Sequence, residues 1–240
     1  MTLLLLGGTG ESREIAAQLR GQDAVISLAG ATRHPAAQPL PTRIGGFGGA
    51  EGFATYLRDA GIHAVLDATH PYAARMTQRT ARICQAQQLP YVQLLRPAWV
   101  PEPGDNWIDI GTEADAAAHI PKGSVVFLGT GRQTLEHFAN LEGCAVICRQ
   151  IDPPEKPFPF AGGRYLVGRP PFSVADEVAL FRDLGVDFLV VKNAGGAPSL
   201  TKLTAARQLG IPVLMIARPP RGDWPVVATV DEALTWVRAL

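Results

Sequence analysis

The chain has 240 residues, of which 47% are hydrophobic and 18% are charged, and it contains 25 glycines and 20 prolines. This composition is typical of a soluble globular protein with many ordered turns, and it excludes a disordered chain and a fibrous repeat. The 22 Lys and Arg residues balance 22 Asp and Glu residues, so no overall electrostatic field would attract nucleic acid or an anionic membrane. We therefore expect any anionic ligand to be held by local basic groups.

Cysteine usage and apolar runs indicate the compartment. Cys84, Cys144 and Cys148 form an odd set without paired zinc-type spacing, which favours reduced thiols and predicts neither a disulfide nor a metal site. The leucine run at residues 3–6 is shorter than the ~7 to 15 residues of a signal-peptide core. No other run approaches the ~18 apolar residues that cross a bilayer. The sequence thus predicts a cytoplasmic protein that binds neither nucleic acid nor membrane.

The first half of the chain alternates short apolar runs with amphipathic stretches, which is the rhythm of βαβ units with a mainly parallel sheet. We expect strands at residues 2–6, 24–29, 42–44, 63–68 and 90–95, and helices at residues 12–20, 51–60 and 72–88. Pro71 suits the first turn of the last of these helices.

A proline-rich segment at residues 96–111 lacks periodicity and is typical of a connector between domains. Beyond it the rhythm returns, with strands expected at residues 124–128, 145–150, 187–191 and 212–216 and helices at residues 113–119, 173–184, 199–209 and 231–239. Residues 152–169, rich in proline, glycine and aromatic residues, are expected to form a long ordered loop. We therefore predict an α/β protein with domains at residues 1–98 and 99–240.

The two halves share a short glycine turn. Gly-Gly-Thr-Gly at residues 7–10 follows the first strand, and Gly-Thr-Gly at residues 129–131 follows a strand of the second half. Either the halves repeat one structure, or the similarity of two short turns is accidental.

The first of these turns lies between a strand and a helix, where bare backbone and the N–H groups of a helix start can bind a pyrophosphate. Two departures from the dinucleotide-binding pattern are visible. Arg13 stands where the third glycine belongs, and Glu11 brings a carboxylate close to the phosphate position. A tight turn without ligand is the alternative. Arg33 follows the second strand, where an acid usually binds the ribose of NADH, and its guanidinium would favour the 2′-phosphate of NADPH.

Further turns follow the next strands at the same edge of the sheet, where ligands of open parallel sheets collect. Gly-Gly-Phe-Gly-Gly at residues 45–49 permits close approach of a ligand to the backbone. Thr69 and His70 end the fourth strand and can hydrogen-bond a ligand, although a purely structural histidine is the alternative. The candidate cofactor ligands are Gly8, Thr9, Gly10, Glu11, Ser12, Arg13, Gly30, Arg33, Gly46 and Thr69.

Three glycine-rich turns of the second half each carry a cation. They are Gly-Thr-Gly-Arg at residues 129–132, Gly-Arg-Pro-Pro-Phe at residues 168–172 and Lys-Asn-Ala-Gly-Gly at residues 192–196. Each lies at a predicted strand end or just before a helix, so together they would form a pocket for several carboxylates or phosphates. Solvated surface cations are the alternative. The candidate substrate ligands are Tyr72, Thr130, Arg132, Arg169, Lys192, Asn193 and Lys202.

These motifs, together with Asp-Ala-Thr-His-Pro-Tyr-Ala at residues 67–73, occur in an order that resembles the precorrin-6A reductase family of cobalamin biosynthesis, from Thr2 to about Arg218. The resemblance implies two Rossmann-like domains with a ligand cleft between them, the first binding the dinucleotide and the second the substrate. It also implies an NADPH-dependent oxidoreductase of porphyrin metabolism that reduces one double bond of a tetrapyrrole, converting precorrin-6A to precorrin-6B. Gly131 departs from the family pattern, which often has a serine there.

The catalytic roles follow from this resemblance. The nicotinamide would supply the hydride, and the proton could come from His70, from Lys192 or from water. Two other functions fit the turns, namely an NADP-linked reductase of a small substrate and a non-enzymatic module that binds NADP(H). Neighbouring enzymes of the cobalamin pathway are considered as partners.

Overall fold

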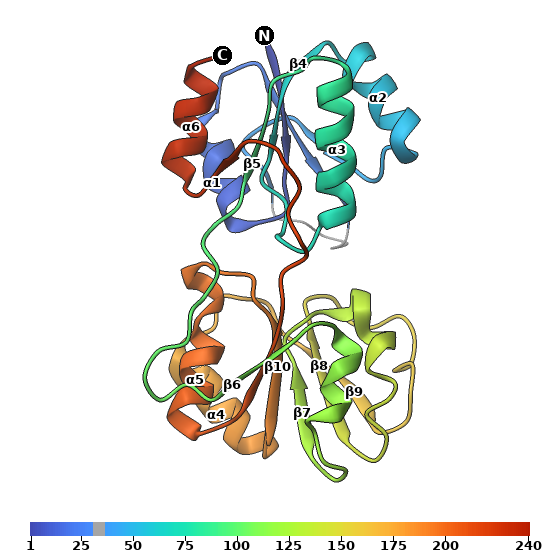
Figure 1. Cartoon of the computed structure of the whole chain (residues 1–240), viewed down its shortest axis with the longest axis vertical. Coiled ribbons are helices and arrows are strands. Elements are labelled where there is room, and N and C mark those ends of the chain that lie inside the picture. Colours follow the sequence, from blue (N-terminus) through green and yellow to red (C-terminus); the bar gives the residue numbers. More distant parts are fainter. Residues whose placement is uncertain (31–36) are drawn as a thin grey trace. The chain divides into compact units, whose positions relative to one another are not determined.

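The computed structural model describes residues 1–30 and 37–240, which divide into two compact units (Figure 1). Unit 1 comprises Met1–Pro97 and Pro219–Leu240, and unit 2 comprises Ala98–Arg218. The expected second domain extended to residue 240, whereas the structure returns residues 219–240 to unit 1. The physical reason is the packing of their helix, which buries Ala233 and Leu234 in the core of unit 1.

Unit 1 is built on a six-stranded sheet of order β12-β5-β4-β1-β2-β3, in which every described pairing is parallel. Its strands are β1 (Thr2–Leu6), β2 (Ala24–Leu28), β3 (Thr42–Ile44), β4 (Ile62–Asp67), β5 (Tyr91–Leu94) and β12 (Val226–Val227), and its helices are α1 (Gly10–Gln18), α2 (Gly49–Asp59), α3 (Ala74–Ala86) and α6 (Val230–Arg238). Helices α1 and α6 cover one face of the sheet, and α2 and α3 cover the other (Figure 1).

The leucines of β1 show that this sheet is buried on both faces. Leu3 and Leu5 belong to the core cluster that contains Ile15 of α1. Leu4 and Leu6 belong to the cluster on the side of α2. Because successive residues of a strand point to opposite faces, a continuous apolar run is typical of a central strand in a parallel sheet.

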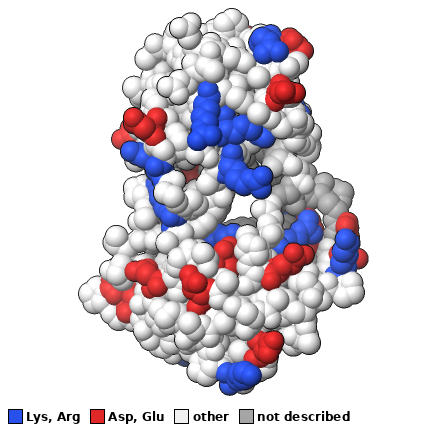
Figure 2. Space-filling view, turned by 45° about the vertical axis from the view of Figure 1, so that its right-hand side comes forward, with Lys and Arg blue, Asp and Glu red and all other residues white. Residues whose placement is uncertain are grey.

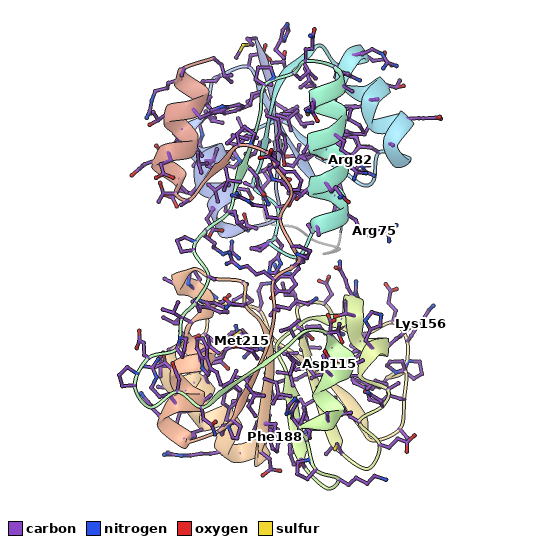
Figure 3. All side chains as sticks on the ribbon, viewed as in Figure 1. Arg75, Arg82, Asp115, Lys156, Phe188 and Met215 are labelled. Atoms are coloured by element: carbon purple, nitrogen blue, oxygen red, sulfur yellow. The ribbon has the colours of Figure 1, made fainter. Side chains whose placement is uncertain are left out.

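Unit 2 is built on a second six-stranded sheet, of order β6-β11-β10-β7-β8-β9, again with parallel pairing throughout the described strands. Its elements are β6 (Trp107–Ile110), β7 (Val125–Leu128), β8 (Ala145–Gln150), β9 (Gly163–Val167), β10 (Phe188–Lys192), β11 (Val213–Ile216), α4 (Val174–Leu184), α5 (Thr201–Leu209) and the 3₁₀-helices η1 (Glu113–Ala118), η2 (Arg132–Phe138) and η3 (Ala197–Ser199). Met215 of β11 packs in the core beneath α4 and α5 (Figure 3).

The two sheets repeat one strand order. In unit 1 the order β3-β2-β1-β4-β5 corresponds to β9-β8-β7-β10-β11 in unit 2, and both are the order of a Rossmann-like sheet. In each sheet a sixth strand pairs with the fifth, β12 with β5 and β6 with β11. In the sequence, β6 follows β5 of unit 1 but pairs in the sheet of unit 2, and β12 follows β11 of unit 2 but pairs in the sheet of unit 1. The repeated order confirms two Rossmann-like α/β domains and favours structural repetition over accidental similarity of the glycine turns.

Most predicted elements are present, and the differences have local causes. The helix expected at residues 72–88 begins at Ala74. Residues 71–73 form a turn before it, in which the Ala73 N–H donates to the carbonyl oxygen of His70. The helix expected at residues 113–119 is the 3₁₀-helix η1. The loop expected at residues 152–169 contains β9. The sequence does not predict β6 or β12, which are short edge strands after proline-rich segments.

The surface charge is uneven although the formal net charge is zero. Lys and Arg side chains gather on the face of unit 1 that Figure 2 presents. Arg75 and Arg82 project outward from α3 (Figure 3). Within residues 1–30 and 37–240, no helix is long and apolar enough to span a bilayer.

Candidate functional site

The turn after β1 is held by reciprocal capping between Thr9 and Ser12. Thr9 is the N-cap of α1, and its Oγ1 accepts the Ser12 N–H at 3.1 Å. The Ser12 hydroxyl accepts the N–H groups of Gly8 and Thr9 at 3.1 and 3.0 Å and donates to the Thr9 carbonyl oxygen at 2.8 Å. Ser12 is only 1% exposed. The side chain of this predicted cofactor ligand therefore stabilises the turn from its buried side.

The glycines of this turn have different tasks. A Cβ on Gly7 would lie 2.8 Å from Cδ1 of Ile26, so Gly7 is required by packing. Gly8 has a φ of +119°, a conformation that residues with side chains rarely adopt. A Cβ on the exposed Gly10 would meet no atom within 4 Å. The fold therefore does not need a glycine at position 10, and the space over this residue is open to a ligand.

The first N–H groups of α1 complete the turn. Helix α1 begins at Gly10, and the described residues provide no hydrogen-bond acceptor for the N–H groups of Gly10 and Glu11. Such groups lie at the positive end of the helix dipole and bind phosphates in many proteins. The residues of this turn therefore fit a dinucleotide pyrophosphate.

Thr9 also joins this turn to the turn after β4. Its hydroxyl donates to the carbonyl oxygen of Ala68 at 2.8 Å. Next to Ala68, Oδ1 of the fully buried Asp67 accepts the N–H and the hydroxyl of Thr69 at 3.0 and 2.6 Å. The predicted ligand Thr69 is thus fixed by Asp67, a residue that the sequence analysis did not select. A carboxylate that closes an otherwise apolar strand is the signal that could have identified it.

Asp67 also acts on the groups packed behind it. Its Oδ2 accepts the hydroxyl of Tyr91 at 3.1 Å. Burial and the Asp67 charge raise the pKa of the Tyr91 hydroxyl above its ordinary value and the pKa of the Cys84 thiol to about 12. Both groups therefore stay protonated at physiological pH, and Tyr91 remains a hydrogen-bond donor to the carboxylate.

Glu11 forms an ion pair with Arg96, which follows β5. Nη1 of Arg96 lies 2.8 Å from Oε2 of Glu11, and the two side chains are 13% and 23% exposed. Burial lowers the pKa of Arg96, while the charge of Glu11 and its hydrogen bond oppose this shift. Glu11 is therefore a compensated charge. The sequence analysis missed Arg96 because 85 residues separate the partners.

Arg43 organises the glycine turn after β3. Its two terminal nitrogens donate to the carbonyl oxygens of residues 45 and 46, each at 2.6 Å. The predicted ligand Gly46 is exposed in this turn, and Gly30 is exposed after β2 with a φ of +78°. Arg33 lies outside the described residues, so its role at the ribose stays a prediction.

Three further candidates lie near the same strand ends in unit 1. Arg13 is exposed in the first turn of α1. His70 is exposed after Thr69, and its Nδ1 accepts the N–H of the half-buried Tyr72 at 3.3 Å, with the two rings 5.7 Å apart. An Nδ1 that accepts a hydrogen bond places the proton of a neutral imidazole on Nε2.

Lys192, at the end of β10, is paired inside unit 2. Its Nζ lies 3.4 Å from Oε1 of Glu113 and donates to the Thr134 hydroxyl at 3.3 Å, and the Lys192 side chain is 14% exposed. Burial tends to raise the pKa of Glu113, but hydrogen bonds from its own backbone and from Thr134, together with the Lys192 charge, lower it overall. This residue, predicted as a substrate ligand and as a proton donor, thus compensates a carboxylate.

A buried ion pair lies behind the turn at residues 168–172. Arg149 donates from Nη1 and Nη2 to Oε2 and Oε1 of Glu177 at 2.8 and 2.7 Å, and the two side chains are 9% and 1% exposed. The Arg149 guanidinium also lies 4.2 Å from the ring centre of Phe172, which packs this turn onto the pair. Neither Arg149 nor Glu177 was selected from the sequence.

Lys202 belongs to the same cluster. Its Nζ donates to the carbonyl oxygen of Ser199 at 3.0 Å. Burial, with a contribution from the Arg149 charge, lowers the pKa of Lys202 to about 8, although Glu177 acts in the opposite direction. The predicted substrate ligand Lys202 is thus used within unit 2.

Arg132 and Arg169 are the exposed cations among the predicted substrate ligands. Arg132 begins η2 after the Gly-Thr-Gly turn. The Arg169 side chain is 54% exposed, and its Nη2 lies 3.9 Å from Oδ1 of Asp152. Thr130 is half-buried between β7 and η2. These two arginines therefore offer the accessible positive charges of the three cationic turns.

The side chain of Asn193, a predicted substrate ligand, hydrogen-bonds the backbone of Trp99 near the start of unit 2. Its Oδ1 accepts the N–H of Trp99 at 2.8 Å, and its Nδ2 donates to the Trp99 carbonyl oxygen at 3.0 Å. The indole N–H of Trp99 donates to the Gly196 carbonyl oxygen at 3.0 Å. The Lys-Asn-Ala-Gly-Gly turn is therefore tied to the incoming chain of unit 2.

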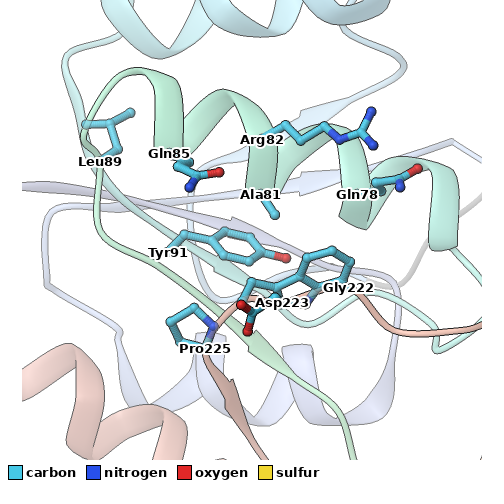
Figure 4. Close-up of a pocket in the computed structure, with 10 residues that line it drawn as sticks. Gln78, Ala81, Arg82, Gln85, Leu89, Tyr91, Gly222, Asp223 and Pro225 are labelled. Atoms are coloured by element: carbon cyan, nitrogen blue, oxygen red, sulfur yellow. The ribbon is translucent and has the colours of Figure 1, made fainter.

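A separate hollow of about 420 Å³ lies in unit 1 between α3 and the segment before β12 (Figure 4). Gln78 and Arg82 of α3, Tyr91 and Asp223 are among its lining residues. Tyr91 begins β5 and Pro225 precedes β12, and the lining contains no residue of the glycine turns after β1 and β3. None of the candidate ligands lines it. In the described part of the chain, no group of three or more His, Cys, Asp or Glu residues is placed to hold a metal ion.

Comparison with known proteins agrees with this arrangement. Residues 2–238 match the family model described as precorrin-6x reductase CbiJ/CobK. The chain belongs to the precorrin-6x reductase family. The precorrin-6A reductase of Rhodococcus erythropolis is 46% identical, over 99% of this chain and 98% of that protein, and that of a Sinorhizobium species is 41% identical, over 97% and 90%. The solved structure of CobK precorrin-6A reductase has a TM-score of 0.94 at 40% identity and covers 99% of this chain and 96% of that one.

Membership in the precorrin-6x reductase family makes the chain an oxidoreductase of cobalamin biosynthesis with a tetrapyrrole substrate. Reductases of this kind need a nicotinamide cofactor. The turn at residues 8–11 has the open glycine and the helix N–H groups that the phosphates of such a cofactor require.

Proposed function

We propose that the chain reduces precorrin-6A to precorrin-6B with NADPH as reductant. The observation that carries this proposal is the turn of unit 1, where Gly10 leaves open space that the fold does not need. The relatives named precorrin-6A reductase, at 46% and 41% identity, support the substrate. When bound, the nicotinamide supplies a hydride to one double bond of the macrocycle.

The choice of NADPH rests on Arg33. The residue follows β2 at the position where an NADH-binding chain usually has an acid for the ribose hydroxyls. A guanidinium there would pair with the 2′-phosphate through charge-assisted hydrogen bonds. Gly8, Gly10 and the first N–H groups of α1 would hold the pyrophosphate.

We assign the substrate carboxylates to Arg132 and Arg169. A precorrin carries many acetate and propionate groups, which a neutral protein must bind through local cations. Lys192 is paired with Glu113, and Lys202 donates to the Ser199 carbonyl oxygen. We therefore propose that these two lysines hold the cationic turns in place and do not bind the substrate. A cytoplasmic location, a ligand cleft between the units and contacts with neighbouring pathway enzymes stay predictions.

We assign proton donation to His70. It is exposed beside Thr69, and its imidazolium form can give one proton to the macrocycle and become a neutral imidazole. The ammonium group of Lys192 is instead engaged with Glu113 and with the Thr134 hydroxyl inside unit 2.

The cofactor site is tested with Gly10→Ala. A methyl group at position 10 meets no protein atom, so we expect a change in unfolding free energy below ~0.5 kcal/mol, or slight stabilisation of α1. The methyl would lie where the phosphate approaches, so the NADPH dissociation constant should rise roughly tenfold or more. Gly7→Ala is the matched control, because its Cβ would contact Ile26 and lower stability instead. Unchanged NADPH binding in Gly10→Ala would exclude this turn as the cofactor site.

The substrate site is tested with Arg132→Met and Arg169→Met. Each should weaken precorrin-6A binding by about tenfold and leave NADPH affinity unchanged, because a charge-assisted contact is lost. Loss of NADPH absorbance on addition of precorrin-6A measures turnover. A parent protein that binds NADPH without consuming it would be a binding module, and one that oxidises NADPH only with a small substrate would be a different reductase.

A further inference from the structure

The ion pair of Glu11 and Arg96 lies at the proposed cofactor turn. Glu11 is the second residue of α1, and Arg96 follows β5 by two residues. In the sheet, β5 lies beside β4 and β4 beside β1. The carboxyl ends of these parallel strands meet at one edge. Arg96 therefore reaches the start of α1 from the edge on which the glycine turn lies.

A carboxylate at this position has opposite effects on the helix and on a ligand. When no ligand is bound, the carboxylate stabilises α1, because it interacts with the positive end of the helix dipole. It would disfavour a bound phosphate, because it repels the anion and competes for the same positive end. Glu11 is 23% exposed and Arg96 is 13% exposed, so salt in the solvent screens their charges only partly.

We propose that Arg96 is a positioning residue for the cofactor, acting through Glu11. Its guanidinium, 2.8 Å from the carboxylate, cancels the negative charge at the start of α1. The N–H groups of Gly10 and Glu11 can then receive a pyrophosphate without repulsion. This inference rests on the proposed function of the turn, and it explains how a chain with an acid at this position can bind a dinucleotide.

The test is a double-mutant cycle with Arg96→Met, Glu11→Gln and the double variant. Arg96→Met should weaken NADPH binding roughly 10- to 100-fold, because the carboxylate is left without its partner. Glu11→Gln should tighten binding by about two- to tenfold, and the double variant should return to within about threefold of the parent. Arg20→Met is the control for net charge, because it removes an exposed arginine beyond the far end of α1.

Two further measurements separate this role from a purely structural one. Adenosine 2′-monophosphate lacks the pyrophosphate, so its affinity should change less than about threefold in Arg96→Met. In turnover with precorrin-6A, the KM for NADPH should rise in Arg96→Met with little change in kcat at saturation. If Arg96→Met fails to fold, Arg96→Gln is compared with Arg96→Lys, which keeps the charge and should retain most of the affinity.

Unchanged NADPH affinity in Arg96→Met overturns the inference. Equal losses in Arg96→Met and in the double variant also overturn it, because they would mean that Arg96 contacts the cofactor directly. Failure of the proposed function has a different signature. In that case the parent protein does not bind NADPH, or Gly10→Ala binds it as the parent does.

Discussion

Replacement of Arg149 by Met removes the positive half of the buried pair in unit 2 and keeps most of the side-chain volume. Glu177, 1% exposed, would lose the two hydrogen bonds that it accepts at 2.7 and 2.8 Å. Removal of one partner of a buried pair costs ~3–5 kcal/mol, because the other charge stays desolvated. Lys202 moderates this cost, since Glu177 attracts its charge and Arg149 repels it. We therefore expect a loss of about 3 kcal/mol in unfolding free energy.

Urea denaturation followed by tryptophan fluorescence and circular dichroism measures this loss. Trp99 and Trp107 belong to unit 2, while Trp224 and Trp236 belong to unit 1. The transition of unit 2 should move to lower urea concentration. The transition of unit 1 should stay, because the pair lies wholly within unit 2.

The double variant Arg149→Met/Glu177→Gln should recover most of the loss, because no unpaired charge remains buried. Arg182→Met, on the exposed side of α4, serves as the control and should change stability by less than ~0.5 kcal/mol. A loss below about 1 kcal/mol in Arg149→Met, or a double variant as unstable as the single one, would refute this reasoning.

Two further predictions concern titratable groups. The pKa of Lys202 is about 8 in the fold and 10.5 ordinarily, so between these values the unfolded chain binds more protons. The stability of the parent relative to Lys202→Met should therefore rise by about 1–3 kcal/mol from pH 8 to pH 10.5, as measured by urea denaturation across this range, and a difference that falls with pH would contradict the shift. His70→Gln should lower kcat about 100-fold or more without changing the KM for NADPH, and an unchanged kcat would assign the proton to water or to Lys192.

The central strands were predictable because their apolar runs are buried on both faces. The inner strands β1 and β8 have the predicted bounds, and the edge strand β3 does too, because it lies between clear turn residues. The other three edge strands, β6, β9 and β12, were missed, because a short edge strand needs little apolar sequence and depends on its neighbour for pairing. The amphipathic pattern predicted α6, but such a pattern does not say which surface covers the apolar face. Placement of α6 in unit 1 follows from its packing on α1.

The turns of the candidate site could also be found from sequence, because glycines after a strand and before a helix have a local meaning. What local sequence cannot show is which side chains are already engaged. Ser12 holds its own turn from beneath, and Lys192 is paired with Glu113 from a distant part of the chain. The ion pair of Glu11 with Arg96 could not be predicted either, because the two residues are brought together only by the order of β1, β4 and β5 in the sheet.

Because the chain returns to unit 1 after unit 2, unit 2 is synthesised in full before the last segment of unit 1. Unit 2 is one continuous segment, Ala98–Arg218, and all its strands exist before β12 and α6 leave the ribosome. Until then unit 1 carries an unpaired edge at β5 and an uncovered apolar face on α1. Such surfaces invite aggregation and are ligands for chaperones on the nascent chain. For separate expression, unit 2 can be excised as one piece, whereas unit 1 requires residues 1–97 to be joined directly to residues 219–240.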